Sequence, residues 1–170
     1  MLLAAALLAW APAALAQESL ELDVKATYLY KLAPFIDWPA QALAPGAFAI
    51  CVVGKDPFGS VLDRAVAGQR VAGRPILVRR MAGADPASGC QIMYLGGPAG
   101  QARQALLAVH GAPVLTVTDG SGSAGIVDFV IDGGRVRFRI DDQAAAENNL
   151  SISSKLLQLA LAVRPRRVRP

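Results

Sequence analysis

The segment Ile50–Leu62, ICVVGKDPFGSVL, indicates the class of fold, because a short apolar run passes through a turn into the start of a helix. The apolar run predicts a buried strand over 48–53. Asp56 followed by Pro57 is typical of a helix start and predicts a helix over about 57–66. Repeated strand–turn–helix units of this kind build parallel sheets.

The turn in this segment, GKDPFG at 54–59, raises the question of a phosphate site. It lacks the closing Gly-Lys-Ser/Thr of a P-loop and the three-glycine spacing of a dinucleotide-binding fold. A helix N-terminus that follows a strand still offers free amides to an anion, and LGGPAG at 95–100 is a second such end. We favour structural turns at both places and keep anion binding as the alternative.

The same alternation of strand and helix continues along the chain. Further strands are predicted over 75–81, 91–95 and 113–119. A helix opened by Gly96-Gly97-Pro98 should end near Val109. Apolar residues at helical spacing predict a first helix from Leu20 to Trp38, which Pro34 should kink or end early. These elements predict an α/β fold, a single domain with a largely parallel central sheet flanked by helices.

A different pattern follows at 126–140, IVDFVIDGGRVRFRI, where strict alternation on both sides of Gly133-Gly134 predicts a β-hairpin. In this register the apolar pairs are Ile131 with Val136, Phe129 with Phe138 and Val127 with Ile140. On the wet face Asp132 lies opposite Arg135 and Asp128 opposite Arg139, which predicts cross-strand ion pairs. The alternative is that Arg135, Arg137 and Arg139 form an anion-binding stripe. A final helix is predicted through KLLQLALAV, residues 155–163, with Ser153 or a neighbouring serine as its cap.

The two ends of the chain differ from the body. Residues 1–16 are continuously apolar and end in Ala14-Leu15-Ala16, which predicts an export signal cleaved after Ala16. No Lys or Arg precedes the apolar run, so a true start further upstream and an uncleaved anchor are the alternatives. Residues 17–163 form the predicted domain, and 164–170, RPRRVRP, a disordered basic tail that contacts solvent or anionic lipid. The tail carries four arginines and the whole chain a net charge of +4, so the body is neutral and nucleic-acid binding is not predicted.

Cys51 and Cys90 are the only two cysteines. In an exported protein an even count favours a disulfide, and these two lie in segments predicted to be strands. Two reduced, buried thiols are the alternative.

Catalytic motifs are scarce. The single histidine, His110, lies where a helix should end, which favours a capping role. There is no GxSxG or HExxH motif, and one histidine with two cysteines makes a poor metal site. We therefore predict no enzyme activity, no cofactor and no metal. The enzymatic alternative would use Asp119 and Ser121, at the carboxyl end of a strand.

Several segments together resemble the YfiR family of small periplasmic proteins. The resemblance is carried by VKATYLYKLAPFIDWP, ICVVGKDPFG, VAGRPILVRR, CQIMYLG, VLTVTD and ISSKLLQLA, in this order, over about residues 23–162. It implies a sheet flanked by helices with a disulfide at Cys51 and Cys90. Better-studied members carry a second disulfide, for which this chain has no cysteines.

The resemblance implies a function as well. Members with known roles hold an inner-membrane diguanylate cyclase inactive from the periplasm, and an outer-membrane lipoprotein releases it. This implies a non-catalytic periplasmic regulator of cyclic di-GMP signalling, and hence of biofilm formation; a homodimer stays open. The alternative is a periplasmic module that binds an aromatic or phosphorylated solute.

The resemblance also suggests where such contacts lie. Trp38, beside Pro39 at a helix end, is either an interface anchor or a core residue. Some members resemble small-molecule binders, with a pocket between the first helix and the final segment. Here that site would comprise Asp37, Trp38, Asn149, Ser151, Ser153 and Lys155. Helix capping alone would also explain the polar residues beside ISSK.

Overall fold

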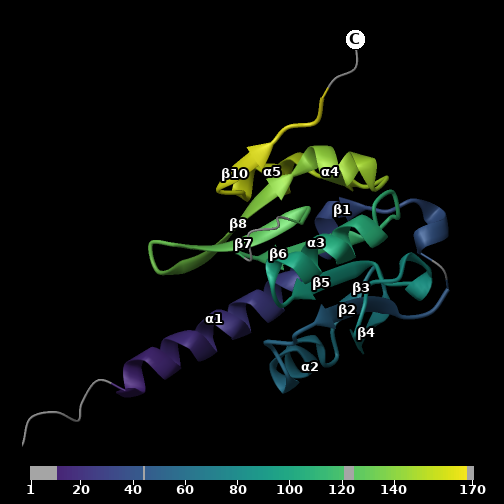
Figure 1. The fold of residues 1–170 in the computed structure, drawn as a ribbon. Helices are drawn as coiled ribbons and strands as arrows, with labels where there is room; N and C mark the ends of the chain where they lie inside the picture. Colours follow the sequence, from purple (N-terminus) through teal and green to yellow (C-terminus); the bar gives the residue numbers. More distant parts are fainter. Residues whose placement is uncertain (1–10, 44, 121–124, 168–170) are drawn as a thin grey trace, which may run out of the picture.

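The computed structural model describes residues 11–43, 45–120 and 125–167, which form a curled mixed sheet with helices on both faces (Figure 1). The helices are α1 (Ala11–Lys31), α2 (Ser60–Val66), α3 (Ala99–Ala108), α4 (Asp142–Glu147) and α5 (Ser154–Leu159). The strands are β1 (Ile36–Asp37), β2 (Phe48–Gly54), β3 (Arg70–Val71), β4 (Arg74–Met81), β5 (Ile92–Gly96), β6 (Leu115–Asp119), β7 (Val127–Asp132), β8 (Arg135–Asp141), β9 (Ser151–Ile152) and β10 (Ala162–Arg164).

The main sheet has the order β10-β8-β7-β6-β5-β2-β4-β3. From β4 through β2, β5 and β6 to β7 all neighbours are parallel, while β8 and β3 join antiparallel. The prediction of a single α/β domain with a largely parallel sheet is therefore confirmed. The chain winds outward from β2 in both directions, so β2 and β5 are the neighbours between which the winding reverses.

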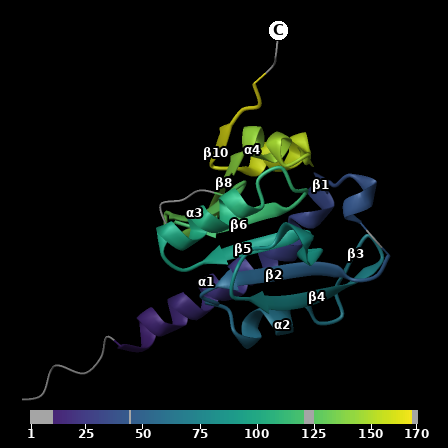
Figure 2. The ribbon, with the colours of Figure 1, turned by 45° about the vertical axis from the view of Figure 1, so that its right-hand side comes forward.

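Helices cover the sheet unequally (Figure 2). α1 and α2 pack on one face, where Leu29 and Leu62 join the larger apolar cluster. α3 covers the other face through Ala102 and Ala105, in a smaller cluster that includes both cysteines. Cys51 and Cys90 form a disulfide, which confirms that pairing. Cys51 lies in β2 and Cys90 two residues before β5, so the bond ties these two neighbouring strands together from within the core.

The first helix differs from its prediction at both ends. It begins at Ala11 and ends at Lys31, and Ala33–Phe35 form one 3-10 turn before β1. Pro34 explains the early end, since proline has no N–H to continue the helix. The predicted cleavage site after Ala16 lies within α1, and cleavage stays a prediction. Across the described residues, no helix is long and apolar enough to cross a membrane.

The hairpin β7–β8 has the predicted register, with Phe129 opposite Phe138 and Asp128 opposite Arg139. Both phenylalanine rings contact Tyr28 of α1, with centroids 6.1 and 5.9 Å away. The predicted cross-strand ion pairs are wrong. Asp128 is buried and instead accepts hydrogen bonds from Thr118 Oγ1 at 2.7 Å and from the amide of Gly120 at 3.2 Å.

The C-terminal segment also departs from prediction. The final helix ends at Leu159, and Ala162–Arg164 form β10, which pairs in parallel with β8. The prediction of a disordered tail from Arg164 is wrong for Arg164 to Arg167. Arg164 bonds to Asp141 at 2.8 Å and Arg166 to Asp142 at 2.8 Å. Residues 168–170, with Arg169, lie outside the described residues.

Candidate functional site

The carboxyl edge of the sheet between β2 and β5 is where a doubly wound fold usually places its ligand. Here the two turns touch. The amide of Lys55 donates to the Gly96 carbonyl at 3.3 Å. A Cβ at Gly54 would lie 2.5 Å from the Gly96 oxygen, and one at Gly96 would overlap the Lys55 carbonyl. These glycines therefore serve the close packing of the turns, and the space for a phosphate between them is filled by backbone.

In the turn after β2, the Asp56 carboxylate accepts the amide hydrogen bonds that a bound anion would accept. Asp56 accepts from the amides of Phe58 at 2.8 Å and Gly59 at 3.2 Å, and from Arg80 Nε at 2.7 Å. Helix α2 consequently starts at Ser60, three residues later than predicted, and its N-cap residue is Gly59. The geometry supports the structural interpretation of DPFG.

A buried lysine lies at the end of β6 and was missed by the sequence analysis. Lys25 of α1 is 4% exposed, and its Nζ donates to Asp119 Oδ1 at 2.9 Å and Oδ2 at 2.8 Å. Glu21, one turn earlier in α1, also pairs with it. The Tyr94 hydroxyl lies 3.4 Å from Asp119 Oδ2. The only feature of the sequence that points to this buried lysine is its place four residues after Glu21, in an otherwise apolar face of the helix.

Electrostatics in this cluster favour a charged lysine. Burial on its own would lower the pKa of Lys25, but the bonds to Asp119 and Glu21 outweigh it and raise that pKa. Burial, reinforced by the neighbouring Asp119 charge, raises the pKa of Tyr94. Asp119 is thus engaged in tying α1 to the sheet. Its proposed catalytic companion Ser121 lies outside the described residues.

The residues suggested by the family resemblance lie mostly around the small ladder β1–β9. Asp37 and Ser151 are register partners there, and both are exposed. Ser153 follows directly: its amide donates to Phe35 O at 2.9 Å, and its side chain accepts from the Leu156 amide, capping α5. Lys155 is exposed in the first turn of α5.

Asn149 has a different environment from the others. It has a positive φ of 57°, and its Nδ2 donates to the carbonyl of Gly111 at 3.0 Å, in the turn after α3. The structure therefore brings together Asp37, Ser151, Ser153 and Lys155, while the amide of Asn149 is used to hold a neighbouring turn.

Trp38, directly after β1, combines both roles that the sequence left open. Its ring stands edge-on to Phe48, with centroids 5.5 Å apart, and packs against the larger core cluster. The side chain is nevertheless only partly buried. Its Nε1 is buried and has no hydrogen-bond partner among the described residues. Trp38 is thus a partly buried core residue with one unsatisfied donor.

Exposed apolar residues follow at the end of α5 and in β10. Leu159, Leu161 and Val163 are 59%, 39% and 37% exposed, and we call these three residues the C-terminal apolar patch. β10 is the edge strand of the sheet, so its outer backbone groups are unpaired within the sheet. Sequence analysis missed this patch because it placed all three residues in a helix.

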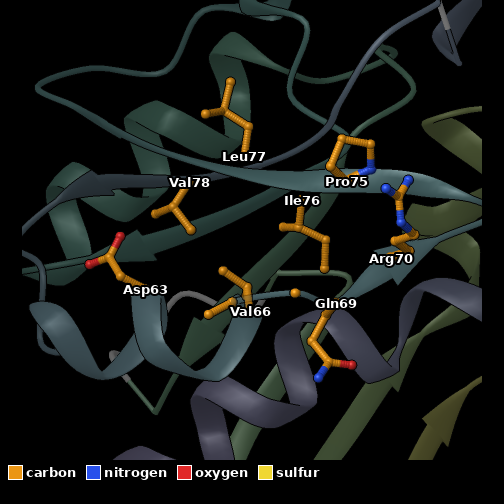
Figure 3. A pocket seen from close by; sticks show the side chains of 10 residues that line it. Asp63, Val66, Gln69, Arg70, Pro75, Ile76, Leu77 and Val78 are labelled. Atoms are coloured by element: carbon orange, nitrogen blue, oxygen red, sulfur yellow. The ribbon is translucent and has the colours of Figure 1, made fainter.

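A separate groove of about 370 Å³ lies between α2 and β4, the strand next to the edge strand β3 (Figure 3). Val66, Ile76 and Val78 point into it, whereas Leu77 points to the opposite side of the strand. Asp63 stands at its mouth and pairs with Arg80 at 2.6 Å, and this pairing lowers the pKa of Asp63. None of the residues predicted as a site lines this groove.

Residues available for metal chemistry are few. Throughout the described part of the chain, no group of three or more His, Cys, Asp or Glu side chains is placed to hold a metal ion. The charged side chains described above form ion pairs within their own clusters. Lys25 pairs with Asp119, and Arg80 pairs with Asp56 and Asp63.

Comparison with known proteins places these features in a family. Residues 22–161 match the family model described as YfiR/HmsC-like, so the match runs from α1 to the end of α5. No curated protein matches the chain significantly.

Proposed function

Because the chain belongs to the YfiR/HmsC-like family, we propose that it is a non-catalytic periplasmic regulator. It binds the periplasmic sensor part of an inner-membrane diguanylate cyclase and represses it, and thereby controls cyclic di-GMP signalling. The match over residues 22–161 is the observation that carries this proposal. An outer-membrane lipoprotein that captures the regulator would relieve the repression.

Two further features support export and regulation. A buried disulfide persists in an oxidising compartment such as the periplasm, and Cys51 and Cys90 form one. A repressor requires no reacting group, only a surface that binds one conformation of its target better than another. The polar groups at the carboxyl edge of the sheet bond to each other, as expected for a binding scaffold.

We place the partner surface at the end of the molecule formed by β1, β9, α5 and β10. Its polar rim would be Asp37, Ser151, Ser153 and Lys155, with Trp38 half-buried among them. The C-terminal apolar patch supplies the anchors that interfaces need at their centre. Asn149 lies at the border of this surface, where it holds the turn at Gly111.

The direct test is cyclic di-GMP itself. Deleting the gene should raise the nucleotide, and overproducing the protein should lower it. Pull-down from solubilised membranes should recover the cyclase. Trp38→Ala and Leu159→Asp should each lose it. Leu159 is 59% exposed, so its variant separates lost contact from lost folding.

A matched control is Leu107→Asp on α3, where the leucine is 71% exposed and belongs to an element outside the proposed surface. It should still recover the cyclase. Unchanged cyclic di-GMP in both the deletion and the overproducing strain would contradict the regulatory function.

The unsatisfied Nε1 of Trp38 favours one second candidate, a module that binds an aromatic or phosphorylated solute. Such a ligand would place an acceptor at this donor. A panel of aromatic acids and sugar phosphates, screened by thermal shift, tests this. Ligand at a hundred times its Kd stabilises by about 2.7 kcal/mol. A stabilisation that survives Trp38→Phe would exclude the indole donor from the site.

A further inference from the structure

The strand β4 is paired along only part of its outer edge. Its inner edge pairs with β2 from Ile76 to Met81, whereas β3 pairs with Arg74 and Pro75 alone. Residues 76–81 therefore have a strand on one side, and within the described chain no strand pairs with them on the other side. A free edge of this length can accept an added strand.

The β3–β4 hairpin shows which backbone groups lie on this free edge. A two-residue turn with positive φ, at residues 72–73, sets Val71 opposite Arg74. In such a hairpin the N–H and C=O of the residue after the turn point to the partner strand, and these groups alternate in direction along the strand. The residues of β4 whose backbone groups point to the same side are consequently Ile76, Val78 and Arg80.

One face of the free edge borders the groove between α2 and β4 (Figure 3). Ile76 and Val78 point into this groove, and Val66 of α2 also lines it. Val66 is buried, whereas Ile76 and Val78 are only half-buried. An added strand would direct every second side chain towards these three residues, so apolar side chains fit at those positions.

The other face of the same edge is basic. Leu77 points away from α2 (Figure 3), and Arg79, two residues later, lies on the same face. Arg70 of β3 is the register partner of Pro75 and shares that face. Both arginines are exposed, and each donates to a backbone carbonyl, at 2.7 and 2.6 Å. Neither forms an ion pair with any described residue, so carboxylates at the intervening positions of an added strand would complement them.

We propose that β4 receives an extended segment of a partner protein as an added strand, with apolar side chains in the groove and acidic side chains on the opposite face. Main-chain hydrogen bonds to residues 76–80 hold the segment, and the alternation of its side chains selects it. This site is separate from the partner surface proposed above, because β10 and the β3–β4 hairpin lie at opposite ends of the strand order. The proposal does not rest on the regulatory function.

Charge distinguishes this occupant from a second copy of the chain. Two β4 edges side by side would bring Arg70 and Arg79 of one copy against the same arginines of the other, and like charges destabilise a strand pair. The arginines therefore oppose pairing of the edge with itself but attract an acidic segment. Anionic lipid would neutralise the arginines and leave the backbone groups of the edge unpaired.

The first test uses a designed peptide as the probe. It has about seven residues, an ordinary strand length, that alternate valine and glutamate. With the full chain, fluorescence anisotropy of the labelled peptide should show saturable binding, and amide hydrogen exchange at residues 76–80 should slow. A peptide that alternates valine and lysine reverses the charge, and one that alternates serine and glutamate removes the apolar side chains. Each should bind at least about tenfold more weakly.

Methylation of the peptide backbone separates strand addition from contact through side chains alone. Two further peptides carry N-methyl groups on alternate residues, one on the valines and the other on the glutamates. Only one edge of an added strand faces β4, so one of these peptides should lose binding and the other should keep it.

Charge reversal on the protein makes the test specific to this edge. Arg70→Glu with Arg79→Glu should weaken binding of the glutamate peptide at least about tenfold and should restore binding of the lysine peptide. Both side chains are exposed, so the fold, checked by circular dichroism, should be unchanged. The matched control is Arg103→Glu, which changes an exposed arginine of α3 and should leave binding unchanged.

Three outcomes would overturn the proposal. One is no saturable binding of the glutamate peptide up to about 1 mM. A second is equal binding of the two N-methylated peptides. The third is protection of residues 76–80 that appears without peptide and increases with protein concentration, which would assign the edge to a second copy.

Discussion

Replacing Lys25 with methionine tests whether the buried ion pair holds α1 on the sheet. Methionine keeps the apolar stem and removes the charge, leaving Asp119 and Glu21 without their shared cation. Both carboxylates are only 28% exposed and Lys25 is 5% exposed at its side chain, so solvent compensates little of the loss. Removing one partner of a buried pair costs about 3–5 kcal/mol, and we expect the lower end because the carboxylates retain some contact with water.

Urea unfolding followed by circular dichroism would measure this loss as a lower midpoint with an unchanged slope. A double-mutant cycle with Asp119→Asn makes the test specific. If the pair is the cause, the double variant should lose less than the sum of the two single variants, since the Asp119 charge is no longer left without its cation. A cost below about 1 kcal/mol for Lys25→Met, or strict additivity in the cycle, would refute the reasoning.

Three other outcomes follow from the structure. The raised pKa of Lys25 should contribute stability at neutral pH and up to about 10.5, the pKa of an unperturbed lysine. This contribution should be lost as the pH rises through the pKa of Lys25 in the folded protein. Alkaline denaturation of the wild type and of Lys25→Met would show the difference. Reducing Cys51–Cys90 should cost about 4 kcal/mol in the chain-entropy model for a separation of 39 residues, seen as a lower Tm with reductant; an unchanged Tm would contradict this. Gly96→Ala should destabilise the protein by more than about 3 kcal/mol, because the new Cβ would overlap the backbone at Lys55. Gly100→Ala in α3, where a Cβ meets nothing within 4 Å, should stabilise the protein by about 0.5–1 kcal/mol. Equal unfolding midpoints for the two variants would contradict this packing.

Elements with a strong local pattern were predictable from the sequence. The register of the β7–β8 hairpin follows from period-two alternation around two glycines, and the observed pairs are those expected. The parallel sheet followed from apolar runs punctuated by turns, and in both cases the information lies within a few residues of chain. The pairing of Cys51 with Cys90 followed instead from the even cysteine count of a chain predicted to be exported and from the family resemblance.

Features that depend on distant partners were not predictable. Lys25 and Asp119 are separated by 94 residues, and only the folded chain brings them together. Asp128 was predicted to pair with an arginine across the hairpin, but it accepts a buried hydrogen bond from Thr118 on the neighbouring strand. The composition of the tail predicted disorder. It does not reveal that Arg164 pairs with Asp141 and Arg166 with Asp142 in the folded chain.

The candidate site shows the same division. Ser153 was predicted as a cap from its position alone and is one. The pairing of β1 with β9, which sets Asp37 beside Ser151, joins segments over a hundred residues apart and has no local signal. The spacing of Leu159, Leu161 and Val163 predicted a helix. The helix instead ends at Leu159, and Ala162–Arg164 pair with the edge of the sheet as β10.

The disulfide has a further consequence for chain integrity. It closes a covalent ring from Cys51 to Cys90, and this ring contains α2, β4 and the edge strand β3. A protease that cuts the exposed segment near Gly68 or Gly83 would therefore produce two peptides that remain linked as one particle. The nicked protein would migrate as a single band until reductant is added, so this end of the sheet can be cleaved without releasing a fragment.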